Sequence, residues 1–282
     1  MSRGGNRSHP PSLLHIVERT LREECSLAAG DCLLLAVSGG SDSTAMLHVM
    51  ARLAPKFGIG LFAHGVDHGL RAEAGRELAL AAKLAGELGV AFSSCQIALA
   101  HGGNLQARAR YARYAALQQR ASEVGARIIA TAHHADDRAE TVLLRLMRGS
   151  GLLGLGVLGP REPTRLRPMI RAHKADILAH LRRHDLPYAS DPSNDNTRYL
   201  RVKVRKEILP ILVAASPGVV QHLCALADQA LEAKSRDSCD SDAMRLGRRQ
   251  RVALARAIEL GQVGFELPLA NDLILSLDRQ RR

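Results

Sequence analysis

The stretch that decides the fold is residues 32–44, which read CLLLAVSGGSDST. The apolar run from Cys32 to Val37 has the length and bulk of a buried parallel strand. Gly39 and Gly40 lack a Cβ atom, so the chain can turn sharply there and a ligand can approach the backbone. Apolar residues then recur at helical spacing, at Ala45, Met46, Val49, Met50 and Leu53. We therefore predict a strand, a glycine turn and a helix whose N-terminus binds an anion.

The turn differs from the common phosphate-binding motifs, because it contains no lysine and no G-x-G-x-x-G pattern. The run Ser38-Gly39-Gly40-Ser41-Asp42-Ser43 resembles, without a gap, the pyrophosphate loop of the N-type ATP pyrophosphatases. Enzymes of that superfamily cleave ATP to AMP and pyrophosphate, so the resemblance implies that this loop binds ATP. The hexapeptide alone leaves open a plain strand-to-helix turn that is capped by Ser41 or Asp42.

Strands and helices alternate at short spacing in the first half of the chain. Further strands are expected at residues 57–63, 90–97 and 127–131, and helices at 73–88, 104–124 and 136–147. This alternation predicts an α/β fold, with a parallel five-stranded sheet and helices on both faces, as in Rossmann-like and adenine nucleotide hydrolase-like proteins. Ligands bind such sheets at the carboxyl ends of the strands. The Ser-Gly-Gly loop and the segments 67–68, 102–104 and 133–134 all fall there, which predicts one shared site.

The chain is expected to comprise three parts. Residues 1–12 are predicted to be a disordered lead, 13–214 a catalytic domain, and 215–282 a small, mostly helical appended domain that ends in a hairpin. After a loop at 151–170, we expect helices at 173–183, 199–212, 218–236 and 244–260, and strands at 263–269 and 273–277. The helix at 199–212 is basic and is expected to end near Pro210. Because Arg282 follows so soon after a strand, we expect a truncated or short form.

The composition narrows the class of protein. The 282 residues are 46% hydrophobic but contain no apolar run long enough to span a bilayer and no signal peptide, so we expect a cytoplasmic protein without a membrane partner. The five cysteines are scattered, which argues against a disulfide framework and against a metal or iron–sulfur site. The formal net charge of +11 suits a polyanion such as nucleic acid, although an arginine-rich genome would give part of the same signal.

A second marked stretch, residues 131–141, reads TAHHADDRAET. Asp137 and Glu140 are three residues apart, so they share one face in the first turn of the expected helix. Two carboxylates in that place can hold Mg²⁺ or an ammonium group, although acidic residues favour a helix N-terminus in any case. His133 and His134 are interpreted as a polar wall or as contacts to a nucleotide.

Several arginines are candidates for phosphate contacts. Arg110 and Arg113 share one face of their helix, and guanidinium groups suit phosphate, although a solvated basic face explains them equally well. Arg148 precedes Gly149 and Gly151 in a loop that can pack closely against a ligand.

Five motifs occur in one order along the chain. They are the Ser-Gly-Gly-x-Asp-Ser loop, DHGLR at 67–71, HHADDRAET at 133–141, RGSG at 148–151 and DPSN at 191–194. In this order they are similar to those of the tRNA(Ile)-lysidine synthetases, and the resemblance covers roughly residues 30–212. Val202 departs from the family, which has Asn there.

That resemblance implies a reaction. Enzymes of the family adenylate C2 of the wobble cytidine of tRNA(Ile) with a CAU anticodon, and the ε-amine of free L-lysine then displaces AMP. ATP and Mg²⁺ are the implied cofactors, and the ATP becomes AMP and pyrophosphate. The sequence leaves a homodimer open.

The resemblance also implies residue roles. Asp42, Asp137 and Glu140 would be catalytic, with Asp42 beside Mg²⁺; Asp137 and Glu140 would bind lysine, and which of them accepts its proton is left open. Nucleotide contacts are expected from residues 38–43 and from His64, Asp67, His68 and His133. Contacts to RNA, AMP or lysine are expected from Arg110, Arg113, Arg148, Asn194, Arg198, Arg201 and Arg205.

Three alternatives remain open at this point. A tRNA thiolation enzyme would share the loop but commonly has a paired-cysteine motif, which this sequence lacks. A ligase similar to GMP synthetase would lack the DPSN segment and such a strong positive charge. A non-catalytic nucleotide-binding or RNA-binding protein would not need the intact loop and acidic pair.

Overall fold

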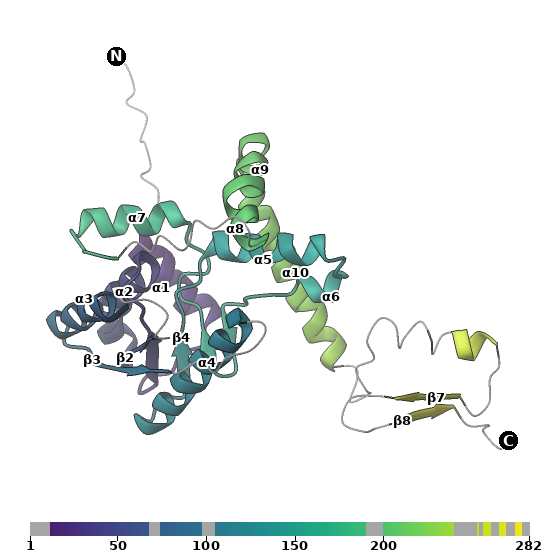
Figure 1. The fold of residues 1–282 in the computed structure, drawn as a ribbon, viewed down its shortest axis with the longest axis horizontal. Coiled ribbons are helices and arrows are strands. Elements are labelled where there is room, and N and C mark those ends of the chain that lie inside the picture. Colours follow the sequence, from purple (N-terminus) through teal and green to yellow (C-terminus); the bar gives the residue numbers. More distant parts are fainter. Residues whose placement is uncertain are drawn as a thin grey trace, which may run out of the picture. The chain divides into compact units, whose positions relative to one another are not determined.

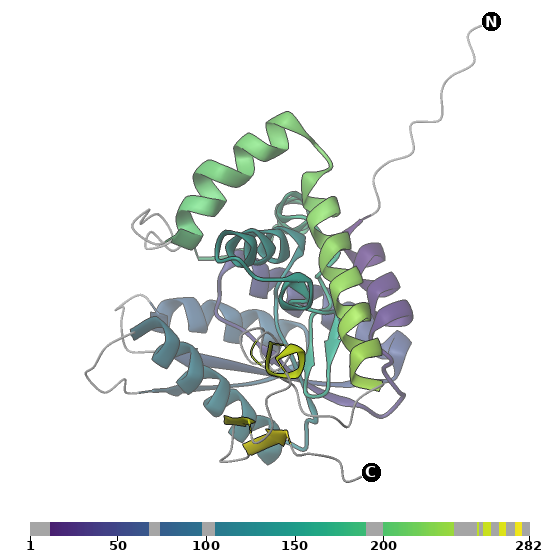
Figure 2. The same cartoon turned by 90° about the vertical axis from the view of Figure 1, so that its right-hand side faces the viewer.

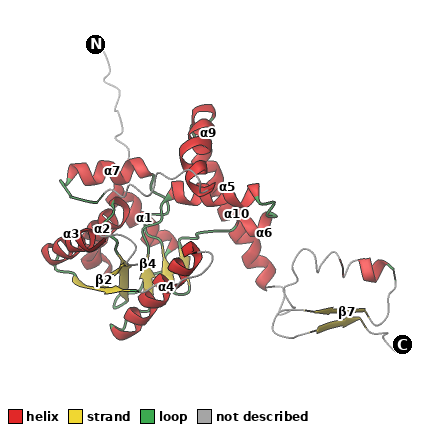
Figure 3. Ribbon diagram, viewed as in Figure 1, coloured by secondary structure: helices red, strands yellow, loops and turns green. Residues whose placement is uncertain are grey.

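The centre of the computed structural model is a six-stranded sheet in the order β3-β2-β1-β4-β6-β5. Its strands are β1 (Cys32–Ala36), β2 (Gly60–Asp67), β3 (Ala91–Gln96), β4 (Ile128–Ala130), β5 (Arg161–Glu162) and β6 (Arg165–Leu166). All neighbours are parallel except β5 and β6, which pair antiparallel at one edge. Figure 3 shows the strands in yellow and the helices in red. The predicted α/β class with five parallel strands is confirmed, and β5 is an additional edge strand.

The structure describes residues 12–67, 74–97, 105–189 and 200–239, with short pieces at 253, 256–260, 265–268 and 274–277. The helices that precede residue 190 are α1 (Leu13–Glu24), α2 (Ser41–Phe57), α3 (Ala74–Glu87), α4 (Leu105–Glu123), α5 (Ala135–Met147), α6 (Leu152–Leu155) and α7 (Lys174–Arg183). They are followed by α8 (Leu200–Lys203), the π-helix η2 (Val204–Ile208), α9 (Leu209–Ala215) and α10 (Val219–Cys239).

Helices cover both faces of the sheet, with α1, α2 and α3 on one side and α4 on the other (Figure 1). Successive side chains of a strand point to opposite faces. Leu33 and Leu35 of β1 accordingly pack in the core beneath α1 and α2. Leu34, between them, packs with Leu117 of α4. All three leucines are fully buried, which explains why β1 reads as a continuous apolar run.

Three expected boundaries are wrong. The strand expected at 57–63 begins later, because α2 continues through Phe57 and ends at Gly58 in the left-handed conformation. The expected loop at 151–170 contains α6, β5 and β6, because β6 joins the sheet by pairing with β4, which is distant in sequence. The basic helix continues past Pro210, which lies in the first turn of α9, where a missing N–H group is tolerated.

The chain divides into two units, Met1–Ala233 and Lys234–Arg282. The division comes later than the boundary expected at 215, because the first turns of α10 pack against α5 through Leu223, Ala227 and Val142. In the second unit, β7 (Phe265–Pro268) and β8 (Ile274–Leu277) pair antiparallel, which confirms the expected hairpin. The functional roles assigned to the two parts of the chain stay predictions.

Among the described residues, no single helix is both long and apolar enough to span a membrane. One pair of helices, Leu200–Ala215 and Val219–Arg236, has the length and composition of a membrane span when taken together, but the two helices meet at a bend of 102° (Figure 2).

Candidate active site

The loop between β1 and α2 requires glycine at one position. Gly39 has a φ of +81°, and a Cβ atom there would overlap the backbone carbonyl of Glu77 in α3. For both reasons, any residue other than glycine at this position would strain the backbone. The backbone of the loop at Gly39 therefore packs closely against the first turn of α3.

Serine hydroxyls fix the rest of the loop. The Ser38 N–H donates to Ser43 Oγ at 3.1 Å, and the Ser43 hydroxyl donates to the Gly40 carbonyl at 3.1 Å. Gly40 precedes the first helical residue and has no side chain that could cap α2. The N–H groups of the first turn are thus available to an anion, and the helix dipole favours negative charge there.

The loop lies at the point where the strand order reverses. β1 has β2 on one side and β4 on the other, and ligands of open α/β sheets bind at such a switch point. The segment after β4 leads into α5, whose N-cap is His134. Two of the marked sequences, the Ser-Gly-Gly loop and residues 133–134, therefore follow neighbouring strands, as predicted.

His134 joins the two segments. Its side chain is buried, and Nε2 lies 3.8 Å from Asp42 Oδ2 and 3.4 Å from Asp137 Oδ2. Nδ1 lies 3.4 Å from Asp136 Oδ2. Burial by itself lowers the pKa of His134, but the carboxylates of Asp136, Asp137 and Asp42 outweigh burial and raise it. The three carboxylates thus favour the protonated form of the His134 imidazole, and His134 in turn lowers the pKa of Asp137.

The acidic pair of α5 is paired with two arginines from the basic helix. Arg201 Nε lies 3.1 Å from Glu140 Oε2, and Arg205 Nη2 lies 3.0 Å from the same oxygen. Nη2 of each arginine also lies 3.2 Å from Asp137 Oδ1. Burial raises the pKa of Asp137, but the nearby histidines and these two arginines lower it further than burial raises it. Hydrogen bonds to Glu140 raise the pKa of Arg205.

Arginines act on the other histidine of this segment, His133. The Thr131 hydroxyl is 2.9 Å from His133 Nδ1, and burial lowers the pKa of this histidine to about 4, assisted by Arg167 and Arg110 and opposed by Asp137. Arg110 and Arg113 both lie over the ring of Tyr114, with their Cζ atoms 5.1 and 5.6 Å from its centroid. The shared face predicted for these two arginines therefore points to one aromatic ring.

Sequence reasoning missed Lys174, the first residue of α7. Its Nζ lies 2.8 Å from Ser41 Oγ and 2.5 Å from Asp42 Oδ1, in the loop that by sequence contains no lysine. No local motif marks this residue. The one available signal is its place directly after the predicted start of a helix at His173.

Other predicted site residues lie elsewhere. His64 is buried in the middle of β2, where Nδ1 is 2.9 Å from Ser93 Oγ. Arg148 is exposed at the C-terminal end of α5, roughly 16 Å along the helix from Asp137 at the usual rise per residue. His68, Asn194 and Arg198 lie outside the described residues.

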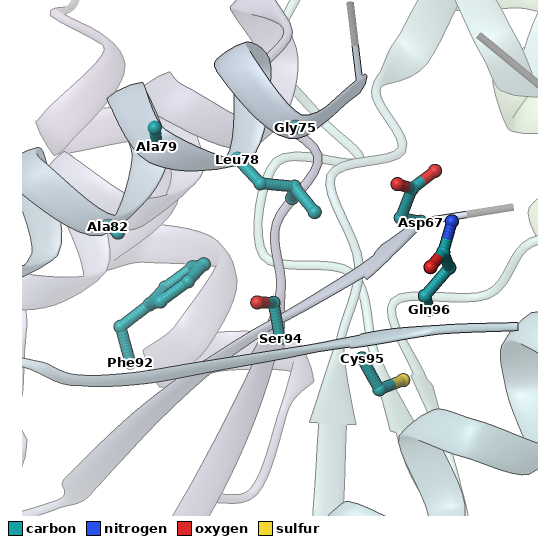
Figure 4. A pocket seen from close by; sticks show the side chains of 9 residues that line it. All are labelled: Asp67, Gly75, Leu78, Ala79, Ala82, Phe92, Ser94, Cys95 and Gln96. Carbon is teal, nitrogen blue, oxygen red and sulfur yellow. The ribbon is translucent and has the colours of Figure 1, made fainter. Parts of the chain in front are cut away.

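Asp67 ends β2 and lines a pocket of about 350 Å³ between α3 and β3 (Figure 4). Leu78 and Phe92 form an apolar part of its wall, and Asp67 and Gln96 lie together at one end. The residues that line this pocket do not include the loop 38–43, so Asp67 does not share this pocket with the loop.

The expected Mg²⁺ requires oxygen ligands. Among the described residues, no group of three His, Cys, Asp or Glu side chains could hold a metal ion by itself. Mg²⁺ usually binds through one or two carboxylates together with phosphate oxygens and water. Asp42, partly exposed at the edge of the loop, fits that mode of binding.

The sequence matches the family model ATP_bind_3, described as a PP-loop domain, over residues 13–212. It is 43% identical to a tRNA(Ile)-lysidine synthase of Novosphingobium aromaticivorans over 211 residues, which are 70% of this chain and 63% of the relative. A tRNA(Ile)-lysidine synthase of Symbiobacterium thermophilum is 41% identical over 72% of this chain and 44% of the relative. The chain thus spans less than two thirds of the length of these relatives.

Among solved structures, the U34-tRNA thiolase NcsA from Methanococcus maripaludis superimposes with a TM-score of 0.66. The match covers 78% of this chain and 79% of that chain, at 18% sequence identity. At that identity the likeness concerns the fold alone.

Proposed function

Because the chain belongs to the PP-loop domain family, whose model covers residues 13–212, we propose that it uses ATP to modify a tRNA. The tRNA is tRNA(Ile) with a CAU anticodon, and the second substrate is free L-lysine. In the product, the ε-amine of this lysine is bonded to C2 of the wobble cytidine. The names of the relatives at 41–43% identity support this choice.

One observation carries the proposal: His134 lies between Asp42 of the loop and Asp137 of the acidic pair. A triphosphate bound at the loop would therefore lie next to carboxylates that can bind an amine. Activation by ATP and transfer of the amine require that these two sites be close together, because the activated intermediate must react before it can diffuse away.

In the first step, the C2 carbonyl oxygen of cytidine attacks the α-phosphorus of ATP. The bond between this phosphorus and the bridging oxygen breaks, and pyrophosphate leaves with the electron pair. The N–H groups at the start of α2 would stabilise the charge that develops on the leaving group. When bound, Mg²⁺ neutralises phosphate charge, and Asp42 is the residue that would hold it.

In the second step, the lysine ε-amine attacks C2, and AMP leaves with the former carbonyl oxygen. The ammonium form has no lone pair, so it must first lose a proton to a base. We assign this base to Asp137 or Glu140. Since Arg201 and Arg205 pair with both carboxylates, the incoming lysine has to displace at least one guanidinium group.

The displaced arginines then have a second role. Guanidinium groups bind phosphate well, and we propose that Arg201 and Arg205 contact the tRNA backbone when they leave the acidic pair. Arg110, Arg113, Arg148 and Arg198 are proposed to contact phosphates of RNA or AMP. The net charge of +11 suits a nucleic-acid partner.

Thiolation is the competing activity within the superfamily. One route to thiolation uses a reactive cysteine thiol, but burial raises the pKa of Cys25 to about 12 and that of Cys224 to about 11. Burial also raises the pKa of Cys32 and Cys95. The described cysteine side chains are therefore poor nucleophiles, which favours lysine transfer.

The test incubates the protein with the tRNA transcript, ATP and labelled L-lysine, and analyses the wobble nucleoside by mass spectrometry. Incorporation of the label supports the proposal and an unchanged cytidine contradicts it. A parallel incubation with sulfide in place of lysine tests thiolation, and a sulfur-containing nucleoside there would also contradict the proposal. Asp42→Ala is expected to abolish ATP–pyrophosphate exchange, and near-normal exchange would remove Asp42 from its assigned role.

A further inference from the structure

The feature with no assigned role is the contact between Lys174 and the pyrophosphate loop. Its ammonium group lies within hydrogen-bond distance of Ser41 Oγ and Asp42 Oδ1, the first two residues of α2. The loop itself contains no cationic side chain. Lys174 is therefore the cation that the fold brings to this loop from a distant part of the sequence.

The backbone of Lys174 is held firmly. Its N–H donates to Asp136 Oδ2 at 2.9 Å, and the neighbouring His173 N–H donates to Asp176 Oδ2 at 2.8 Å. Ile177 and Leu181 of α7 are buried in the same core as Met46 and Met50 of α2. The start of α7 thus has a fixed position, and only the flexible side chain can move.

Stability alone explains this contact poorly. The side chains of Lys174 and Asp42 are 38% and 34% exposed, and ion pairs at that exposure contribute little to folding. Asp42 also has the imidazole of His134 nearby, so it does not depend on Lys174 for a positive neighbour. A side chain with three donors and a mobile stem suits a partner that arrives and departs.

We propose that Lys174 is a further catalytic residue, which exchanges Ser41 and Asp42 for the phosphate oxygens of the pyrophosphate group. In the nucleotide-free protein its ammonium pairs with Asp42. When a triphosphate enters the loop, the phosphates carry more negative charge than a single carboxylate, so Lys174 turns to them. It then neutralises the pyrophosphate as it leaves, without forming a covalent bond, and Asp42 becomes available to a metal ion.

This inference rests on the proposed function only for the identity of the reaction, because the contact itself concerns pyrophosphate. The test is therefore binding of inorganic pyrophosphate, measured by isothermal titration calorimetry with and without Mg²⁺. We expect Lys174→Ala to raise the Kd at least about tenfold, the effect of losing one charge-assisted hydrogen bond. Lys174→Arg is expected to restore most of the affinity.

Lys56→Ala is the matched control, because Lys56 also forms an ion pair, with Glu18, but at the opposite end of α2. Its pyrophosphate affinity is expected to equal that of the wild type. Melting midpoints within about 2 °C of the wild type would show that each variant folds, since larger shifts indicate lost stability. If Lys174→Ala does not fold, Lys174→Met keeps the length of the stem and removes the charge.

Two results would overturn the inference: unchanged pyrophosphate affinity in the variants that remove the charge, Lys174→Ala and Lys174→Met, or a wild-type protein that binds no pyrophosphate. Exchange of labelled pyrophosphate into ATP gives a second readout, in which Lys174→Ala should raise the KM for pyrophosphate more than the KM for ATP. Failure of the proposed function has a different signature. The protein would bind pyrophosphate through Lys174 but would not incorporate lysine into tRNA.

Discussion

At the scale of single residues, the chemistry of the acidic pair, Asp137 and Glu140, depends on the cations that contact it. Glu140 is 1% exposed, and burial of a carboxylate is costly unless cations and hydrogen bonds surround it. Arg201 and Arg205 supply those contacts, and both are partly exposed and able to move into water. The negative charge of the acidic pair is therefore balanced by guanidinium groups that can leave it.

Glu140→Gln tests the role of that carboxylate. The amide has a similar volume but cannot accept a proton, so we expect lysine transfer to fall at least about 100-fold. ATP–pyrophosphate exchange should fall far less, because adenylation does not use this group. Single-turnover measurements of the two half-reactions separate these effects. Equal losses in both steps would contradict the assignment.

A histidine cluster predicts how stability depends on pH. Burial, together with the neighbouring His184, lowers the pKa of His48 and of His180 to about 4. His48 Nδ1 lies 3.0 Å from His180 Nε2, and Arg52 and Arg183 add positive charge nearby. In the unfolded chain these two histidines bind protons near pH 6.5. Their contribution to the free energy of unfolding is therefore fully present above that pH and is lost as the pH falls toward 4.

Thermal melting from pH 7 to 4.5 measures this loss. Each kcal/mol lowers the midpoint by about 2–4 °C in a domain of 150–250 residues, so a drop of several degrees is expected. The double variant His48→Gln, His180→Gln should show a shallower decline, whereas His15→Gln, on the exposed side of α1, should follow the wild type. A decline of equal slope in all three proteins would refute the prediction.

At the scale of elements, a network of ion pairs fixes the position of α5 relative to α1 and α10. Arg138 lies between Asp137 and Glu140 in sequence and is 0% exposed, and its Nη1 is 2.7 Å from Asp228 Oδ1 of α10. Asp228 also pairs with Arg171, which reaches Glu24 of α1. This network joins α1, α5 and α10 behind the acidic pair.

Asp228→Ala would leave the Arg138 guanidinium buried without its carboxylate. We expect a loss of about 3–5 kcal/mol in the free energy of unfolding, measured with urea. Glu24→Ala is the matched control, because it removes one of two partners from the more exposed Arg171, and its cost should be about 1 kcal/mol or less. Equal losses in the two variants would show that Arg138 does not depend on Asp228.

At the scale of the whole molecule, α8 and η2 bring two arginines from a distant part of the sequence to the acidic pair of α5. Arg205 lies in this π-helical turn, a form of helix that is frequent at functional sites. We propose that tRNA binding and lysine entry are coupled, because the same two arginines serve the acidic pair and the RNA.

Salt dependence of tRNA binding tests this coupling. If Arg201 and Arg205 each contact one phosphate of a single-stranded anticodon loop, replacing both with Ala should reduce the slope of log K against log salt by about 1.4. Arg19→Ala, which removes an exposed arginine of α1, should leave the slope unchanged. An unchanged slope in the double variant would place the two arginines away from the RNA.

The sequence by itself determined the order of strand, loop and helix. It also marked the loop 38–43 and residues 133–134, which follow the neighbouring strands β1 and β4. Those features follow from local causes: Gly39 is needed for a positive φ, and Leu33 to Leu35 must be buried on both faces of a sheet. Asp137 and Glu140 also share a face for a local reason, the helical repeat. Such signals lie within a few residues of one another and can be recognised in a linear chain.

Only the tertiary structure decided which cations meet those carboxylates. Lys174 and Asp42 are 132 residues apart, and Arg205 and Glu140 are 65 apart, so no local pattern links them. The sequence suggested RNA contacts for Arg201 and Arg205 and no role for Lys174. Long-range charge pairing depends on how α7 and η2 pack around α5, and packing is a property of the whole fold because buried charges select their partners only when the chain is assembled.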